Sequence, residues 1–441
     1  MKIGFLAMSG IRVQDKKLLE IGLTLPGFVE RSRIIASLPS LGLLALAACT
    51  PPGHDLRYFE SEALEGEWPE LLSCDLVAIS TFSAQIFESY AIAGRLRAAG
   101  VKVAMGGLHV SVLPDEAIQH ADYVVVGEGE NVWPAIVAAA KAGGGPAILR
   151  SANYAPVDMA QLPTPRYDIL GNRPYNRYTV QATRGCPWRC EFCASTVMLQ
   201  APYRHRPVAR VLEDIAFIAR LHPGPFIEFA DDNTFVDKAW GKELCRGLRP
   251  LNVRWFTETD LSVADDTELL DLMREAGCRQ VLVGLESPSA APLEGLELHA
   301  NRKARWADRY AEAIRTIQEH GITVNACFIL GLDGQSPAVF QEVVDFVGRA
   351  HPFDVQITVL TAFPGTPLYA RLTREKRLLE SGAWDRCTLF DVNHRPSHML
   401  PEELRAGMYW LGERLYSHDA THQRRKGFFQ QYEQQHKRSF A

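Results

Sequence analysis

Short apolar runs alternate with helix-length segments along this 441-residue chain, and the alternation restricts the fold more than any other feature of the sequence. A brief apolar run followed by a segment of helical length is the pattern of a strand and its crossover helix in a parallel sheet. The units form two series, separated by a stretch rich in glycine and proline that begins at Gly143. The sequence therefore predicts an α/β protein with two units of this kind.

The first series predicts a doubly wound, Rossmann-like domain over residues 1–145. Its strand-like runs lie at 3–8, 76–80, 101–105 and 124–126, and its helix-length segments include 38–50 and 83–99. The glycines and prolines that follow cannot continue a helix, so we interpret residues 146–178 as a linker between two domains.

The second series contains six strand-and-helix units. One strand is expected just before Cys186, and the others lie at 226–230, 253–257, 280–284, 324–330 and 354–360. Six units are fewer than the eight of a closed TIM barrel, so we predict a partial (β/α)6 TIM-type barrel over residues 179–367. Reactive groups are expected where the carboxyl ends of the strands meet the following loops. Residues 368–441 are predicted to form a helical C-terminal extension.

Charge and composition exclude several functional classes. The net charge of -5 and the pI near 6.2 provide no overall basic field, so we predict no nucleic-acid partner. The start of the chain lacks the features of a signal peptide, and the most apolar run, 38–49, is shorter than the about 20 residues that span a bilayer. We therefore predict a cytoplasmic protein without a transmembrane segment. Nine cysteines, scattered except at one place, argue against a disulfide framework.

That place is a loop with three cysteines, Cys186, Cys190 and Cys193, in a C-x3-C-x2-C spacing directly after a predicted strand. Thiolates this close together suit zinc or an iron–sulfur cluster. A structural zinc site needs four ligands, and the nearest histidine, His205, lies in a separate basic segment. We therefore predict a [4Fe-4S] cluster with one open iron. The alternative is three unrelated core cysteines, because free cysteine is commonly buried.

The triplet, with the aromatic Phe192 directly before the third cysteine, resembles the radical S-adenosylmethionine (SAM) superfamily. The resemblance implies that the open iron binds the amino and carboxylate groups of SAM and passes it an electron, which yields a 5′-deoxyadenosyl radical. It also implies an external electron donor of flavodoxin or ferredoxin type, and a contact between Phe192 and the SAM adenine. Cys186, Cys190 and Cys193 would then be metal ligands and catalytic residues.

Residues at the ends of four later strands are implied to complete the SAM site. They are Asp231, Asp232 and Asn233 after the second strand, Glu258 and Asp260 at the third, Glu286 at the fourth and Gly331 at the fifth. Many relatives carry Gly-Gly-Glu after the second strand, but the acidic residues here still suit the ammonium group of SAM. The carboxylates have an alternative role as helix caps, and the glycine as part of a tight turn.

Three small residues after predicted strands of the first domain, Ser80, Gly106 and Gly107, resemble the cobalamin-binding domain that is joined to many radical SAM enzymes. Small residues there would let a nucleotide tail lie between sheet and helices, and the resemblance implies cobalamin as a cofactor. The Asp-x-His-x-x-Gly signature of a cobalt-ligating histidine is absent, and neither His54 nor His109 sits in that pattern. Cobalt would therefore lack a protein histidine. The alternative is a vestigial domain that binds no cobalamin.

Two segments near the C-terminus, 361–369 and 384–388, resemble the helical extension of a subgroup that includes hopanoid methylases. Together the resemblances cover nearly the whole chain. They imply a cobalamin-dependent methyltransferase that acts on an unactivated carbon of a small-molecule or lipid-like biosynthetic intermediate. One alternative is a radical SAM enzyme for cyclisation, rearrangement or oxidation that transfers no methyl group. Another is a non-catalytic sensor that binds cobalamin or an iron–sulfur cluster.

Overall fold

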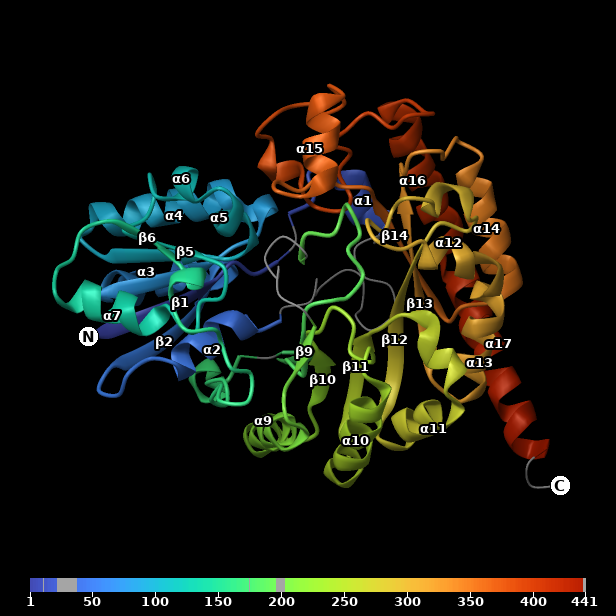
Figure 1. Cartoon of the computed structure of the whole chain (residues 1–441), viewed down its shortest axis with the longest axis horizontal. Coiled ribbons are helices and arrows are strands. Elements are labelled where there is room, and N and C mark those ends of the chain that lie inside the picture. The colour runs from blue at the N-terminus through green and yellow to red at the C-terminus, as the bar shows by residue number, and fades with distance from the viewer. Residues whose placement is uncertain (11, 22–37, 174, 196–202, 439–441) are drawn as a thin grey trace.

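A computed structural model describes the chain except for residues 11, 22–37, 174, 196–202 and 439–441. It contains two six-stranded sheets, in each of which every pair of neighbouring strands is parallel. Figure 1 shows the N-terminal sheet with its helices on the left, beside the second sheet and its helices on the right. The predicted α/β class with two parallel-sheet units is confirmed.

The first sheet has the strand order β2-β1-β3-β4-β5-β6 and carries helices on both faces. Phe5 of β1 packs against Trp133 of α7 with ring centroids 5.7 Å apart, while the next residue, Leu6, belongs to a separate core that includes side chains of α3 and α4. This alternation is what a doubly wound sheet requires. The strands are β1 (Lys2–Ala7), β2 (Asp55–Glu60), β3 (Leu76–Ser80), β4 (Lys102–Gly106), β5 (Tyr123–Val126) and β6 (Ala147–Arg150). The helices are α2 (Leu41–Ala48), α3 (Leu64–Leu72), α4 (Ile86–Ala98), α5 (Leu108–Val112), α6 (Pro114–Ala117) and α7 (Trp133–Lys141).

The sequence pattern missed both edge strands of this sheet. In β2 the residues Asp55 and Arg57 are exposed, and in β6 both end residues are exposed. Because parts of β2 and β6 face solvent, these strands lack the continuous apolar run that marks a strand buried on both faces. Strand β6 lies within the segment 146–178 that was expected to be a linker.

The second sheet has the order β14-β13-β12-β11-β10-β7 and does not close, because β7 and β14 remain its two edges. The predicted partial barrel of six strands is confirmed. Its strands are β7 (Tyr178–Val180), β10 (Phe226–Phe229), β11 (Arg254–Glu258), β12 (Cys278–Glu286), β13 (Thr323–Leu330) and β14 (Asp354–Val359). Its helices are α9 (Val208–Leu221), α10 (Lys238–Leu248), α11 (Thr267–Glu275), α12 (Arg302–Trp306), α13 (Tyr310–Glu319) and α14 (Val339–Ala350). A short antiparallel hairpin of β8 (Thr183–Arg184) and β9 (Arg204–His205) flanks the cysteine triplet.

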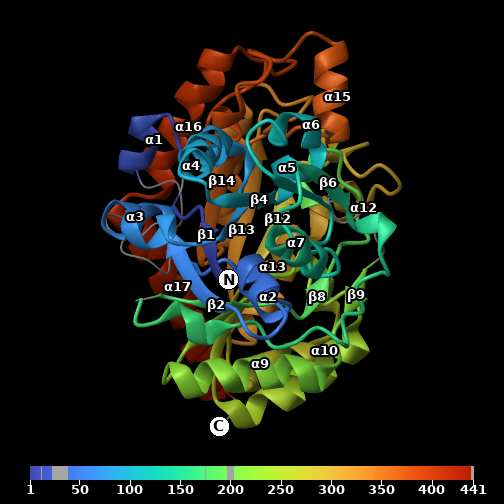
Figure 2. The same ribbon diagram turned by 90° about the vertical axis from the view of Figure 1, so that its left-hand side faces the viewer.

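The C-terminal extension is helical, as predicted, and packs along the barrel. It contains α15 (Pro367–Arg374), α16 (Pro401–Leu415) and α17 (His418–Arg438). Helix α16 packs against α14 and against α1 (Lys16–Ile21), which the sequence pattern had not indicated, and α17 packs against α13 and β14. Figure 2 shows α15 and α16 at one end of the molecule and α9 and α10 at the other, with the N-terminal sheet between them.

Candidate active site

The loop that carries the three cysteines, residues 185–195, follows β8, and we call it the cluster loop. One edge of it is held by backbone hydrogen bonds to the segment after β12. The Glu191 N–H donates to the Leu296 carbonyl over 2.9 Å, and the Leu298 N–H donates to the Arg189 carbonyl over 2.8 Å. The loop therefore has a defined position at the carboxyl end of the barrel sheet.

None of the three cysteines is in a disulfide; Cys190 is buried, and Cys186 and Cys193 are half-buried. Burial raises the pKa of Cys186 to about 12 and also raises that of Cys190, where nearby Lys303 opposes part of the rise. Iron must displace these protons, because the thiolate is the ligand. Within the described ranges, no group of three or more His, Cys, Asp or Glu side chains is arranged to hold a single metal ion. A cluster is bound differently, because each cysteine ligates its own iron atom.

Asp231 is buried, and its hydrogen-bonding capacity is used within the protein. Its carboxylate accepts hydrogen bonds from the Ala182 and Thr183 N–H groups and from the Thr234 hydroxyl, each over 2.9 Å. Burial nevertheless raises the pKa of Asp231 to about 7. These contacts tie the end of β7 to the end of β10, so Asp231 supports the loop rather than facing open space.

Asp260 and Asn233 also make protein contacts, and Asp260 holds the cluster loop. Its carboxylate accepts from the indole of Trp188 (3.0 Å), from the Asn233 amide (3.0 Å) and from the Arg302 guanidinium (2.6 and 3.2 Å). Burial acts to raise the pKa of Asp260, but the Arg302 hydrogen bonds and charge outweigh it and hold that pKa far below its usual range. Because Trp188 lies between the first two cysteines, Asp260 ties the cluster loop to the end of β11.

Asp232 and Glu258 are the candidate carboxylates that face the space beside the cluster loop. Asp232 is half-buried beside the Ser195 side chain and the Gly185 backbone, which act to lower its pKa, but burial outweighs them and raises it. Glu258 is exposed although β11 lies inside the sheet, so the space it faces is the interior of the barrel. Confinement there, together with the nearby carboxylates of Glu228 and Asp232, raises the pKa of Glu258 to about 8. Among the described residues, no hydrogen bond or ion pair engages its carboxylate.

Glu286 is buried at the end of β12 and pairs with a lysine that the sequence pattern did not reveal. The Lys303 ammonium lies 2.8 Å from the Glu286 carboxylate and 2.5 Å from the Gly284 carbonyl. Glu286 has a φ of 66°, a left-handed conformation that non-glycine residues rarely adopt. Lys303 and its neighbour Arg302 lie on the short helix α12, and no spacing motif links them to the strand-end carboxylates. Only the tertiary contacts identify them.

Gly331 and Phe192 have different surroundings. Gly331 has a φ of 93°, its N–H donates to the Gln335 side chain over 2.9 Å, and a Cβ at this position would lie 2.9 Å from Leu404 of α16. The glycine therefore serves a turn that packs against the C-terminal extension. Phe192 is half-buried and packs against the barrel core.

Small and apolar residues form the carboxyl end of the N-terminal sheet. Ser80 and Gly106 are half-buried, and Gly107 has a φ of 109°. A Cβ on Gly107 would lie 2.4 Å from the Thr81 carbonyl oxygen, so only glycine fits there, whereas a Cβ on Gly106 would meet Val125 at an ordinary 3.7 Å.

The carboxyl ends of the two sheets meet around an apolar pocket. Its lining comes from the ends of β3 and β4, from the cluster loop and from the segment after β14: Phe82, Ser83, Leu108, Val112, Ala194, Phe363 and Pro364. Phe82 is 61% exposed, and an exposed aromatic side chain at a sheet end is suited to cover by a bulky ligand. Since Ala194 directly follows Cys193, the edge expected to bind cobalamin adjoins the cluster loop. The hollow itself has a volume of only about 20 Å³. The chemistry of this edge, small at Gly107 and apolar and exposed at Phe82, suits a bulky cofactor beside the cluster loop.

Neither of the two histidines considered from the sequence is free to ligate cobalt at this edge. His109 is buried, with Nδ1 at 3.1 Å from the Ser83 hydroxyl and Nε2 at 3.2 Å from the Glu116 carboxylate. His54 precedes β2 and therefore lies at the opposite, amino end of the parallel sheet. This geometry agrees with the missing signature.

Part-buried ion pairs join the loop after β5 to the hairpin that flanks the cluster loop. Arg184 donates to Glu128 and to Glu130, each over 2.6 Å, and Arg204 donates to Glu128 over 2.5 Å. Both carboxylates belong to the sequence Gly127-Glu128-Gly129-Glu130, more than fifty positions from Arg184. The contacts fix the N-terminal sheet relative to the cysteines.

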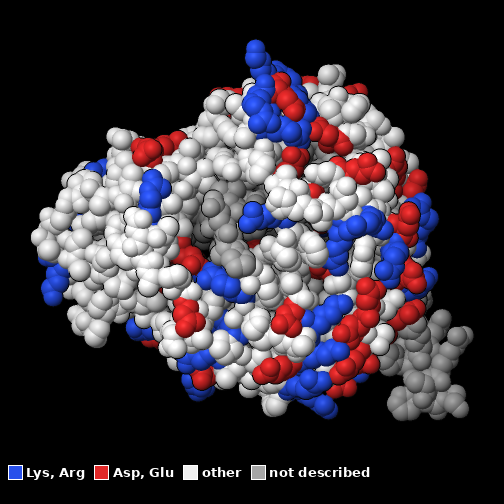
Figure 3. Space-filling view, in the orientation of Figure 1, with Lys and Arg blue, Asp and Glu red and all other residues white. Residues whose placement is uncertain are grey.

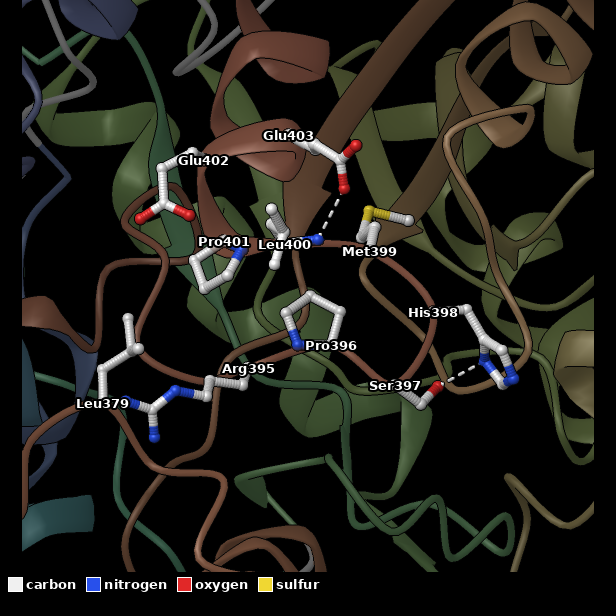
Figure 4. A pocket seen from close by; sticks show the side chains of 10 residues that line it. All are labelled: Leu379, Arg395, Pro396, Ser397, His398, Met399, Leu400, Pro401, Glu402 and Glu403. Carbon is white, nitrogen blue, oxygen red and sulfur yellow. Dashed lines mark hydrogen bonds between the residues drawn. The ribbon is translucent and has the colours of Figure 1, made fainter.

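A second hollow, with a volume of about 590 Å³, lies elsewhere on the C-terminal segment. Figure 4 shows its lining, which comes from Leu379 and residues 395–403 and includes none of the candidate site residues. Figure 3 shows few charged side chains on the N-terminal unit in this view, while both signs of charge intermingle over the barrel helices. None of the helices in the described part of the chain has the length and apolar character needed to cross a membrane.

The fold and the site define a class: a doubly wound domain joined to a six-stranded partial barrel, with a three-cysteine loop at the carboxyl end of the barrel sheet. Family models match in the same order, namely a B12 binding domain at residues 36–137, the radical SAM superfamily at 180–347 and a domain of unknown function (DUF4070) at 366–441. The chain belongs to the radical SAM enzymes that carry a B12-binding domain. The expected membership is confirmed, and so are the cofactors that these families imply, a [4Fe-4S] cluster, SAM and cobalamin.

Similar proteins support this membership. Bacteriochlorophyllide d C-12(1)-methyltransferase of Chlorobaculum tepidum is 26% identical over 88% of this chain and 84% of its own length. Hopanoid C-2 methylase of Rhodopseudomonas palustris is 27% identical over 78% of this chain and 66% of its own length. The anaerobic magnesium-protoporphyrin IX monomethyl ester cyclase of Rubrivivax gelatinosus is 25% identical over 69% of this chain and 58% of its own length. The solved structure of the radical SAM methyltransferase TsrM from Kitasatospora setae has a TM-score of 0.66 at 15% identity, covering 93% of this chain and 88% of that one. That likeness shows a shared fold.

Proposed function

We propose that this radical SAM enzyme is a cobalamin-dependent C-methyltransferase that acts on an unactivated carbon of a small-molecule or lipid-like substrate. The observation that carries the proposal is that Phe82 and Leu108 of the N-terminal sheet end adjoin Ala194 of the cluster loop around one small apolar hollow. Methyl transfer to an inert carbon needs a radical source and a methyl carrier next to the same substrate atom. Sheet ends that adjoin in this way would bring the two cofactors to the same substrate.

Three sets of residues would hold the cofactors. The cluster would be bound by Cys186, Cys190 and Cys193, SAM by Asp232, Glu258 and Glu286 with Phe192 at its adenine, and cobalamin by Ser80, Gly106 and Gly107. When bound, the cluster and SAM supply a carbon-centred radical, and cobalamin supplies a methyl group. The protein positions these groups and excludes water from the pocket between them.

Asp232 is the residue best placed to receive the ammonium group of SAM. It lies against the cluster loop at Gly185 and Ser195, whereas the hydrogen-bonding capacity of Asp231 is used by its neighbours. Glu258 faces the barrel interior without a protein partner among the described residues, which suits a ribose hydroxyl as hydrogen-bond donor. Glu286 is already paired with Lys303, so its contact to SAM would be shared with that ammonium group.

Product analysis tests this assignment. The protein would be reconstituted anaerobically with iron, sulfide and cobalamin, reduced, and incubated with SAM and with bacteriochlorophyllide d or a hopanoid as probe substrate. We expect S-adenosylhomocysteine that forms only when cobalamin is present, together with 5′-deoxyadenosine. An external flavodoxin or ferredoxin type donor remains a prediction, which replacing the chemical reductant by each protein would test. A cobalamin-independent yield of S-adenosylhomocysteine, or none, would overturn the methyl-transfer proposal.

A cyclase is the second candidate function, because the cyclase relative of Rubrivivax gelatinosus aligns over 69% of the chain. A cyclase uses the same radical but moves no methyl group. The experiment above separates the two functions, since a cyclase would release 5′-deoxyadenosine without cobalamin-dependent S-adenosylhomocysteine. Cytoplasmic location stays a prediction.

A further inference from the structure

The cluster loop is held on its second edge by a helix of the C-terminal extension. Glu191 lies between Cys190 and Cys193, and its carboxylate accepts two hydrogen bonds from Arg371 of α15, from Nε over 3.1 Å and from Nη2 over 2.6 Å. Its backbone carbonyl accepts from the Leu368 N–H of the same helix over 3.0 Å. Side chain and backbone of one loop residue are thus bound by a single helix.

The same guanidinium also reaches the turn after β13. Arg371 Nη1 donates to Asp333 over 2.6 Å, and the other oxygen of Asp333 accepts from Arg377 over 2.7 Å. Burial alone would raise the pKa of Asp333, but Arg377 and Arg371 outweigh it and lower that pKa to about 2. Asp333 follows Gly331, the expected SAM contact, by two positions. Arg371 therefore joins the cluster loop to the turn at the end of the fifth barrel strand.

We propose that Arg371 is a positioning residue that sets where the cluster loop sits relative to the end of β13, and thereby relative to bound SAM. The inference rests on the proposed cluster at Cys186, Cys190 and Cys193. It assigns a role to α15, the first helix of the C-terminal extension. Residues 366–441, which include this helix, match a domain of unknown function. A guanidinium is needed at position 371, because its planar group donates hydrogen bonds to two carboxylates in fixed directions. A lysine ammonium lacks this fixed geometry.

The test compares Arg371→Gln and Arg371→Lys with Arg374→Gln. Arg374 is on the same helix, is exposed, and has no ion pair among the described residues, so it controls for the loss of a charge from α15. Arg377→Gln removes the second bond to Asp333, together with the bonds of Arg377 to Glu375 and to the Arg395 carbonyl, and leaves the Arg371–Glu191 pair in place. Each full-length variant would be reconstituted anaerobically, and its folding checked by circular dichroism and its iron content measured before further assays.

Both Arg371 variants are expected to retain iron but to raise the KM for SAM in 5′-deoxyadenosine formation on the order of tenfold, because small misplacements of reacting groups are costly. They should also weaken the change that SAM causes in the electron paramagnetic resonance spectrum of the reduced cluster. Glu191→Gln should do the same, and the double variant Glu191→Gln with Arg371→Gln should be no worse than either. A merely structural contact would change the melting temperature without changing the spectrum.

Two results would overturn the inference: an unchanged KM and spectrum in Arg371→Gln, or full retention of both by Arg371→Lys. The proposed function is judged separately. If the unaltered protein forms no four-iron cluster, the proposed site fails. If the unaltered protein forms the cluster and Arg371→Gln behaves like Arg374→Gln, only the positioning role fails.

Discussion

The carboxyl ends of the two sheets are built from opposite kinds of residues. At the barrel end, charged groups are held in place by partners, as Asp260 is by Arg302, and Glu258 is left to face the interior. At the N-terminal end, Gly107 removes side-chain volume and Phe82 presents an exposed ring. The first arrangement suits a small, charged cofactor, because carboxylates pair with an ammonium or sulfonium group. The second suits a bulky cofactor that is recognised by shape and apolar contact.

The comparison also shows how the two ends are joined. Glu128 and Glu130 project from the N-terminal unit onto Arg184, directly before the cluster loop. On the other side, Arg371 joins the loop to the extension. The cysteines therefore lie between two sets of ion pairs, so their position depends on the assembly of all parts of the chain.

The largest effect is expected from removing a cluster ligand. Cys190→Ala should reduce bound iron and SAM cleavage to background, because three protein thiolates are needed to hold the cluster. Iron content, the visible spectrum and 5′-deoxyadenosine yield would be measured after anaerobic reconstitution. Cys49→Ala, at a half-buried cysteine of the N-terminal unit, is the control and should leave all three unchanged. Equal iron content in both variants would contradict the assignment of Cys190 as a cluster ligand.

A large loss of stability is expected when the ion pairs between the N-terminal unit and the barrel are weakened. Glu128→Ala leaves the buried Arg184 and the half-buried Arg204 with fewer acceptors, which should lower the free energy of unfolding by about 2 kcal/mol. Guanidinium unfolding would measure the change. Glu65→Ala, at an exposed position, should cost far less. If the two variants have equal stability, the ion pairs do not join the units.

A smaller effect should be specific to the cobalamin end. Gly107→Ala places a methyl group 2.4 Å from the Thr81 carbonyl oxygen in a left-handed conformation, so we expect a loss of about 1–3 kcal/mol and weaker cobalamin binding. Gly94→Ala, in α4 and outside the proposed cobalamin site, is the control, because an added Cβ there meets no atom within 4 Å. Thermal melting and cobalamin bound per chain would be measured. Equal cobalamin binding by the two variants would argue against a ligand at this edge.

The smallest effect concerns a carboxylate at the carboxyl end of the barrel sheet and the pH dependence of stability. The pKa of Glu258 rises from 4.5 to about 8 in the folded protein, which therefore holds this proton more tightly than the unfolded chain does. The contribution of Glu258 to the free energy of unfolding therefore falls as the pH rises from 4.5 to about 8. Glu258→Gln should flatten the decline of the melting temperature of SAM-free protein over this range, whereas Glu294→Gln, at an exposed position, should not. The same decline in both variants would show that the folded protein does not hold the Glu258 proton more tightly than the unfolded chain does.

Much of the fold was predictable, because central parallel strands are buried on both faces and read as apolar runs. The edge strands β2 and β6 were not, since half-exposed strands lack that run. In the site, the cysteine spacing predicted the chemistry, but the carboxylates could not be ranked from sequence. Asp231, Asp232 and Asp260 all lie near strand ends, and only their partners separate supporting residues from those that face open space.

The sequence by itself determined the local chemistry of this enzyme: three thiolates on one short loop, strand-end carboxylates and glycines where backbones approach closely. Such features depend on residue type and near spacing, which a linear pattern records. The tertiary structure alone decided how they combine, since Arg184, Lys303 and Arg371 meet their partners across separations that follow no sequence period. Ion pairs and pockets form between elements that the chain brings together only on folding, so their membership is a property of the packed molecule.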